Sequence, residues 1–196
     1  MIASSKNFSI TPEEYLQMED KSSIKHEYIN GEMYAMAGAS DAHVTISLNL
    51  AALLRSHVRG RGCRVYISDM KARIETKHKN KFYYPDVMVT CDKRDQETTN
   101  YKSFPCLIVE VLSDSTEAFD RGDKFADYQT LDSLQEYVLI NPKRQRVECF
   151  RRGDNGLWTL EFYTAEKSVF QLKSIEFEGS LADLYEDLSW ELQSET

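Results

Sequence analysis

One short segment constrains the fold of this chain more than any other. Residues 105–112 read Pro-Cys-Leu-Ile-Val-Glu-Val-Leu. A nearly continuous apolar run that is rich in branched side chains is typical of a central strand buried on both faces. Glu110 interrupts that run, and burying a carboxylate is costly unless its charge is paired or bound to a metal ion. The segment therefore predicts a sheet-containing core with an acid placed inside it.

A second acid lies in a similar setting upstream. Asp86 follows Pro85 in Tyr-Tyr-Pro-Asp-Val-Met-Val, within a strand expected from Phe82 to Thr90. Hard divalent cations such as Mg²⁺ and Mn²⁺ prefer carboxylate and water oxygens. If neighbouring strands bring Asp86 and Glu110 together, the pair predicts a magnesium-type site. The alternative is that each is a satisfied buried acid, for example one paired with an arginine.

The remaining patterns predict an α/β or α+β chain. A capping box at Thr11-Pro12-Glu13-Glu14 predicts a helix to about Glu19, and Asn30-Gly31 predicts a hairpin turn. Apolar spacing and flanking turn residues then predict these elements in order: a helix 41–59, strands 63–67 and 70–74, the strand 82–90, a loop 91–103 with one helical turn, a helix from the 113–116 turn to about 131, strands 136–140, 147–150, 157–163 and 169–177, and a helix 181–186. We expect one domain over residues 1–196, with a core at about 24–142 and a C-terminal β extension at about 143–190.

Composition narrows the class of protein. Hydrophobic residues make up 41% of the chain and charged residues 29%, which is typical of a globular protein. The net charge of −8 argues against a uniformly basic surface that coats nucleic acid. Basic residues do gather between positions 55 and 81 and between 143 and 152, where they line either a phosphate-facing surface or an ordinary solvated one.

The cysteines and the apolar segments indicate the compartment. Cys63, Cys91, Cys106 and Cys149 lie far apart in the sequence without zinc-ligand spacing, and no segment approaches the length of a membrane-spanning helix. We expect a cytoplasmic protein with reduced thiols.

Pro85-Asp86, followed by Glu110 in an apolar strand and then by a helix, resembles the PD-(D/E)XK nuclease superfamily. Within it, the chain is similar to the restriction-endonuclease-like family of unknown biological role. The segments that carry this resemblance are HEYINGE, AGAS with His43 after it, GCRVYISDM, YYPDVMV, LIVEVLSDST, DRGDKFADY and EYVLINP. Together they cover roughly residues 15–185.

The resemblance implies a restriction-endonuclease-like fold with a mixed sheet flanked by helices, and magnesium-dependent hydrolysis of DNA phosphodiester bonds. The superfamily places a lysine two residues after the glutamate, but this chain has Leu112 there. In some branches the lysine comes from the following helix, so Lys124 is the candidate replacement. Its role would be to position or help deprotonate the attacking water. A surface ion pair is the alternative reading.

Three further residues are candidates with weaker support. Asp120 lies four residues before Lys124 and is expected to orient it from the same helix face. Glu27, beside the hairpin turn, is a candidate extra ligand or water-positioning group, or else a solvated side chain. His43 at the start of the long helix is expected to contact substrate phosphate or Glu110, or to be structural.

Two classes of function remain open from the sequence. The first is a metal-dependent DNA endonuclease that uses Asp86, Glu110 and Lys124 with Mg²⁺ or Mn²⁺, with RNA as another possible substrate. The second is a catalytically inactive module with the nuclease fold that binds nucleic acid or protein, suggested by the missing motif lysine. Cutting both strands of a duplex commonly needs two active sites, so a homodimer is expected, with the C-terminal strands as its interface or as a cover for the core sheet.

Overall fold

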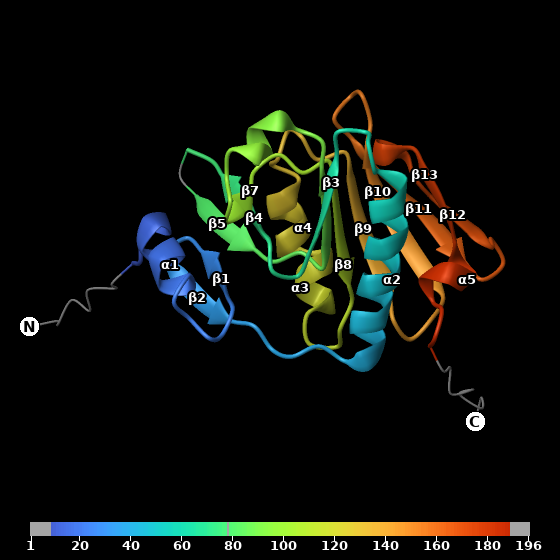
Figure 1. The fold of residues 1–196 in the computed structure, drawn as a ribbon, viewed down its shortest axis with the longest axis horizontal. Helices are drawn as coiled ribbons and strands as arrows, with labels where there is room; N and C mark the ends of the chain where they lie inside the picture. The colour runs from blue at the N-terminus through green and yellow to red at the C-terminus, as the bar shows by residue number, and fades with distance from the viewer. Residues whose placement is uncertain (1–8, 78, 189–196) are drawn as a thin grey trace, which may run out of the picture.

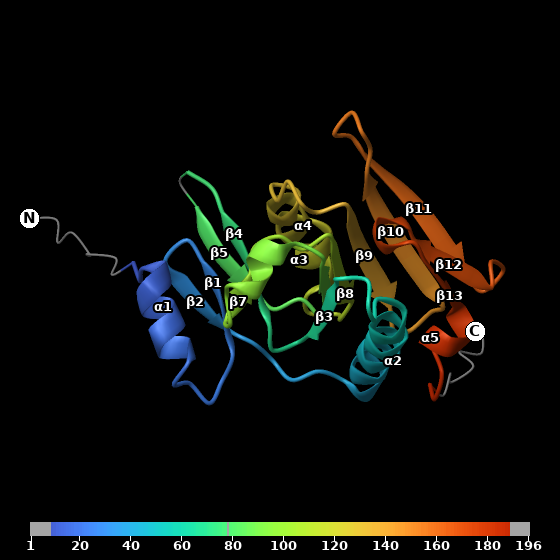
Figure 2. The same ribbon diagram turned by 45° about the horizontal axis from the view of Figure 1, so that its top comes forward.

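The computed structural model describes residues 9–77 and 79–188, which form two main β-sheets, a small separate hairpin and five α-helices (Figure 1). Helices α3 (Glu117–Arg121) and α4 (Asp123–Tyr128) lie between the two main sheets, and α2 (Asp41–His57) covers the opposite face of the larger sheet (Figure 2). Within the described ranges, no helix is long and apolar enough to cross a membrane.

The smaller sheet has the strand order β2-β1-β5-β4-β7. Its strands are β1 (His26–Ile29), β2 (Glu32–Ala35), β4 (Lys71–Glu75), β5 (Asn80–Tyr83) and β7 (Tyr101–Lys102). Helix α1 (Pro12–Glu19) packs on this sheet through Tyr15, and the capping box at Thr11 is present as predicted. The predicted hairpin joins β1 to β2, with Asn30 at φ 52° and Gly31 at φ 106°, the positive angles that such a turn needs.

The larger sheet has the strand order β11-β10-β9-β8-β6-β3. Its strands are β3 (Arg64–Ile67), β6 (Val87–Thr90), β8 (Leu107–Val111), β9 (Glu136–Asn141), β10 (Arg146–Arg152) and β11 (Trp158–Thr164). Strands β8 and β9 are parallel and their neighbours are antiparallel, so the mixed sheet that was predicted is confirmed.

The central strand β8 is buried on both faces, as its composition predicts. Val109 and Val111 face the core that includes α2 (Asp41–His57), whereas Ile108 faces the core that includes α4 (Asp123–Tyr128). Side chains alternate along a strand, so Glu110 shares the face of Ile108. This alternation directs the carboxylate of Glu110 toward α4.

The strand predicted over 82–90 is wrong in one respect: two strands occupy it. The chain leaves the smaller sheet after Tyr83 and enters the larger sheet at Val87. Pro85 has no N–H for a sheet and restricts the residue before it, so the segment from Tyr84 to Asp86 bends between the sheets. The adjacent predicted strands 63–67 and 70–74 also lie in different sheets, because β3 pairs with β6 whereas β4 pairs with β5.

The single helix predicted from the 113–116 turn to about residue 131 is also wrong. It consists of α3 (Glu117–Arg121) and α4, which meet at Gly122 with φ −111° and ψ −102°. These angles lie outside the helical region. Across this break, Lys124 Nζ still lies 3.5 Å from Asp120 Oδ1.

The C-terminal extension adds β10 and β11 to the sheet, then the hairpin of β12 (Val169–Leu172) and β13 (Phe177–Ser180), and α5 (Leu181–Leu184). The predicted single strand 169–177 is wrong, because the 3₁₀ turn η2 (Lys173–Ile175) reverses the chain. The carboxylate of Glu136 on β9 accepts hydrogen bonds from the backbone N–H groups of Lys173 and Ser174, at 3.0 and 2.7 Å. A long-range contact therefore holds this turn. Residues 189 and 190 of the expected extension lie outside the described residues.

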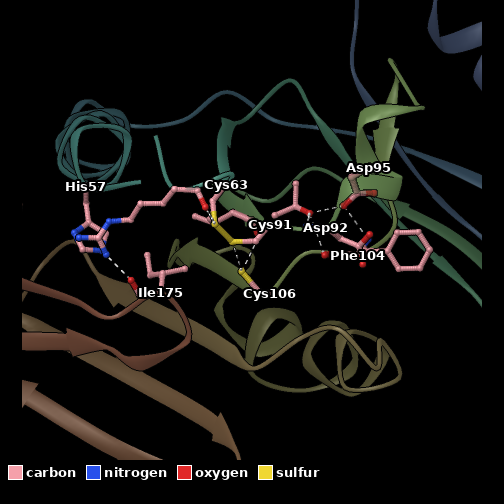
Figure 3. Close-up of a disulfide and its surroundings, with 11 residues drawn as sticks. His57, Cys63, Cys91, Asp92, Asp95, Phe104, Cys106 and Ile175 are labelled. Atoms are coloured by element: carbon pink, nitrogen blue, oxygen red, sulfur yellow. Dashed lines mark hydrogen bonds between the residues drawn. A yellow bond between two sulfur atoms is a disulfide. The ribbon is translucent and has the colours of Figure 1, made fainter. Parts of the chain in front are cut away.

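The loop 91–103 contains one helical turn, η1 (Lys93–Gln96), as predicted, but its residues Tyr101–Lys102 form strand β7 by pairing with β4. The expectation of four reduced thiols is wrong for two of them, because Cys63 and Cys91 form a disulfide (Figure 3). The antiparallel register pairs Arg64 with Thr90, so the residues just beyond them face each other. Their separation along the chain hid this proximity.

Candidate active site

Strand pairing brings Asp86 and Glu110 to the same end of the larger sheet. β6 and β8 are antiparallel with Val87 opposite Val109, so Asp86, just before β6, lies beside the end of β8. The backbone N–H of Val111 donates to Asp86 Oδ2 at 2.7 Å, which fixes that carboxylate next to the strand. The structure therefore places both acids at one end of the larger sheet, and their shared metal site stays a prediction.

Lys124 reaches into the same region from α4. Its Nζ lies 3.0 Å from Glu110 Oε1, 3.2 Å from Glu27 Oε1 and 3.5 Å from Asp120 Oδ1. The side chain of Lys124 is only 7% exposed, so the reading of a surface ion pair is excluded. One ammonium thus joins carboxylates from β1, β8 and α3.

Electrostatics in this cluster follow from burial and from the surplus of acids. Burial alone lowers the pKa of Lys124, but Glu110, Glu27 and Asp120 together raise it above its usual value, so the ammonium stays charged. Burial raises the pKa of Glu110 well above its usual value; Lys124 opposes that rise, whereas Asp120, Asp86 and Glu27 add to it. Four carboxylates and one ammonium leave the cluster with excess negative charge.

Glu110 also accepts a hydrogen bond from a tyrosine hydroxyl. Tyr128 OH donates to Glu110 Oε1 at 3.2 Å from the next turn of α4. Burial and the Glu110 charge raise the pKa of Tyr128, which keeps this hydroxyl protonated as a donor. The sequence alone assigns no role to the Tyr128 hydroxyl. The i, i+4 spacing of Lys124 and Tyr128, which places both side chains on one face of the helix, is the sequence signal for this contact.

His43 lies near the start of α2, and its contact differs from the predicted one. Its Nε2 is 2.8 Å from Asp86 Oδ1, and among the described residues it forms no hydrogen bond or ion pair with Glu110. Both side chains are about one-sixth exposed, so the pair lies at the rim of the site. His43 is therefore placed to orient Asp86.

Glu27 is also brought to the site. Besides Lys124, Glu27 Oε1 accepts a longer hydrogen bond, 3.4 Å, from the backbone N–H of Tyr84. Its side chain is 15% exposed, which excludes the solvated reading. The hairpin of the smaller sheet thus supplies an acid to a cluster based on the larger sheet.

The matching family model covers residues 12–182 and is described as "Uma2: Putative restriction endonuclease". The chain belongs to this family. The resemblance found in the sequence is confirmed, and with it a nuclease-like class of function for the Uma2 chain.

Two relatives and one solved structure extend this result. Two uncharacterized proteins of Synechocystis sp. (strain ATCC 27184 / PCC 6803 / Kazusa) are 40% and 38% identical over 181 and 168 residues. The alignments cover 92% and 83% of this chain and 94% and 92% of those proteins. A crystal structure of "a putative nuclease belonging to DUF820" from Anabaena variabilis ATCC 29413 matches with a TM-score of 0.70 at 19% identity, over 88% of this chain and 96% of that one. This likeness shows that the Uma2 chain has the same restriction-endonuclease-like fold.

Proposed function

We propose that this Uma2 chain is a metal-dependent endonuclease that hydrolyses phosphodiester bonds of DNA in the cytoplasm. The observation that carries the proposal is the 3.0 Å contact between Lys124 Nζ and Glu110 Oε1. The superfamily motif lysine is replaced by Leu112, which is buried in the α4-facing core. Lys124 supplies an ammonium to the same glutamate from the helix.

The donor set fits a divalent metal ion. Asp86 and Glu110 offer hard oxygen donors, and the excess negative charge around Lys124 is what a bound dication would balance. Among residues 9–77 and 79–188, no three His, Cys, Asp or Glu side chains are grouped to hold a metal ion. The two carboxylates of Asp86 and Glu110 would hold the ion as a pair, with water and substrate oxygens completing the shell. Such an ion activates water and stabilises phosphoryl charge.

The other side chains have roles that follow from their contacts. Lys124 remains an ammonium because its pKa is raised, so it orients the attacking water and offsets phosphoryl charge rather than removing a proton. Asp120 and Glu27 fix its position from two sides. His43 holds the carboxylate of Asp86 from the rim, as an outer partner of a metal ligand does.

A plasmid cleavage assay with Mg²⁺ or Mn²⁺ tests the proposal. We expect metal-dependent cleavage by the wild type and a loss of at least about 100-fold in Asp86→Asn and in Glu110→Gln. Asp114→Asn is the matched control, because this carboxylate is 81% exposed and pairs only with Lys143 among the described residues. It is expected to cut like the wild type.

Calorimetric titration with Mn²⁺ separates the enzyme from the alternative of an inactive module. We expect wild-type binding that is abolished in Asp86→Asn. A wild type that neither binds Mn²⁺ nor cuts any nucleic acid would overturn the proposal and favour the binding module. Cleavage of RNA alone would overturn only the choice of DNA.

A homodimer is part of the proposal. β11 is an edge strand of the larger sheet and carries Leu160 and Phe162 with exposed side chains, 41% and 40%. An edge strand offers free backbone groups for pairing with a second copy. Two copies related by a two-fold axis would supply two active sites for the two strands of a duplex.

A further inference from the structure

Three cysteine sulfurs meet at the end of the larger sheet away from the acid cluster. Cys63 and Cys91 are disulfide-bonded, and the Cys106 Sγ lies 3.8 Å from the Cys91 Sγ. Figure 3 shows the sulfur of Cys106 directed at the disulfide. Cys106 is a free thiol. A disulfide and a free thiol are thus in contact through Cys91.

The strand order explains why these sulfurs gather. Cys63 precedes β3, Cys91 follows β6 and Cys106 precedes β8, and these three strands are neighbours in the sheet. Because β6 is antiparallel to both neighbours, its end lies beside the start of β3 and the start of β8. Cys91, on the middle strand, therefore has a cysteine on either side.

We propose that Cys63, Cys91 and Cys106 form a thiol–disulfide exchange site, in which Cys91 alternates between Cys63 and Cys106 as its disulfide partner. The Cys106 thiolate attacks the Cys91 Sγ, the Cys91–Cys106 bond forms, and the Cys63–Cys91 bond breaks. Cys63 leaves as a thiolate and takes up the proton that Cys106 lost. The exchange is an isomerisation that consumes no oxidant or reductant, and it proceeds by direct attack of a thiolate on a disulfide sulfur.

The approach required for this step is short. A disulfide bond is about 2.05 Å long, so the Cys106 sulfur must move by roughly 2 Å from its 3.8 Å contact. Cys106 is only partly exposed, and Cys91 is exposed just after the end of β6. Cys63, once released, is partly exposed and open to a reagent from solution.

The exchange moves a covalent link within the sheet. In the described structure the link joins the ends of β3 and β6. After exchange the disulfide would join β6 to β8. Strand β6 follows Asp86 directly, and β8 carries Glu110. The exchange depends only on the positions of the three cysteine sulfurs and is independent of the proposed nuclease activity.

Alkaline pH is expected to accelerate the exchange. Burial raises the pKa of the Cys106 thiol to about 11, so only a small fraction is thiolate at neutral pH. Since the thiolate is the attacking species, the rate should rise roughly tenfold per pH unit between pH 8 and 10.

Trapping by alkylation tests the inference. Protein oxidised with glutathione disulfide, freed of the reagent and incubated at pH 9 with iodoacetamide, is digested and mapped by mass spectrometry. We expect alkylated Cys63 to accumulate together with a Cys91–Cys106 cross-linked peptide. In Cys106→Ser, Cys63 should stay bonded to Cys91 and unlabelled.

Cys149→Ala is the matched control, because Cys149 is a free thiol buried away from this cluster, on β10. It is expected to exchange like the wild type. The labelling pattern of the wild type also tests the exchange without any variant. Label on Cys106 with Cys63 permanently bonded would overturn the inference, as would a failure of Cys63 and Cys91 to form a disulfide on oxidation.

Discussion

At the scale of single residues, one buried lysine, Lys124, provides the positive charge at the centre of the acid cluster. Removing water from several carboxylates is costly, and Lys124 offsets part of that cost by contacting three of them. Because acids outnumber the single ammonium, the site keeps excess negative charge. This charge is what the proposed divalent ion would balance.

The first prediction concerns Lys124→Met, which keeps the length of the side chain and removes its charge. We expect cleavage to fall by at least about 100-fold, because the charge that offsets the phosphoryl group is lost. Mn²⁺ binding should persist, because Asp86 and Glu110 remain. The measurement is single-turnover plasmid cleavage together with calorimetry.

Lys81→Met is the matched control for this experiment. Lys81 is also buried and also pairs with a carboxylate of α4, Asp127, but outside the acid cluster. Its loss is expected to lower stability while leaving the cleavage rate of the folded protein unchanged. Equal loss of cleavage in both variants would show that Lys124 acts only through stability.

At the scale of elements, short α3 depends on the sheet for its position. Arg121 at its end donates to both carboxylate oxygens of Glu148 on β10, at 2.6 and 3.0 Å. Arg146 adds a third hydrogen bond to Glu148 at 2.9 Å. A five-residue helix is too short to be stable alone, so these bonds help to hold Asp120 near Lys124.

The second prediction is that Glu148→Gln destabilises the protein by about 1–2 kcal/mol at pH 7. Burial raises the pKa of Glu148, but Arg121 and Arg146 outweigh burial and lower it below its usual value. A lowered folded-state pKa stabilises the fold above the unfolded-state pKa of about 4.3, and that contribution is lost as pH falls through the folded-state value.

Urea unfolding from pH 7 to pH 3 measures this difference. The gap between wild type and Glu148→Gln should be constant above about pH 5 and should shrink toward pH 3. Glu166→Gln, which changes an exposed glutamate, is the control and should follow the wild type. A gap that does not depend on pH would contradict the role of the ionised Glu148.

At the scale of the whole molecule, the two main sheets meet around α4, whose Phe125 and Tyr128 lie in the hydrophobic core between them. Phe125 of α4 packs against Phe150 and Trp158, so the C-terminal strands cover the core with part of their aromatic face. The same face continues beyond the helices as exposed Leu160 and Phe162, since alternate residues of β11 point to one side. The C-terminal strands therefore cover the core with Phe150 and Trp158 and leave Leu160 and Phe162 exposed for a dimer interface.

The third prediction is that the protein is a dimer through this part of β11. Leu160→Lys should weaken the dimer at least about tenfold, because burying an unpaired charge in an interface is costly. Size-exclusion chromatography with light scattering over a range of concentrations measures the change.

Leu48→Lys provides the control for the dimer, because Leu48 is 60% exposed and lies on α2, which packs on the other face of the larger sheet from α4, Phe150 and Trp158. It should remain dimeric. A wild type that is monomeric at all concentrations would contradict the dimer, and so would equal dissociation of both variants.

The sequence alone determined the features that depend on near neighbours. The capping box at Thr11 and the turn at Asn30-Gly31 are set by residues within a few positions of each other. The placement of Asp86 and Glu110 on neighbouring strands was also predictable, because consecutive apolar strands commonly lie side by side. The family resemblance added the expectation that a lysine from the next helix joins them.

The tertiary structure decided what depends on contacts between distant segments. The division of residues 82–90 between two sheets, the meeting of Glu27 with Lys124 and the disulfide of Cys63 with Cys91 each join parts of the chain that local patterns do not relate. Periodicity shows which face of an element is buried but not which partner buries it. Only the packing of the two sheets around α4 brought Lys124 Nζ within 3.0 Å of Glu110 Oε1, the contact on which the proposed role of this lysine rests.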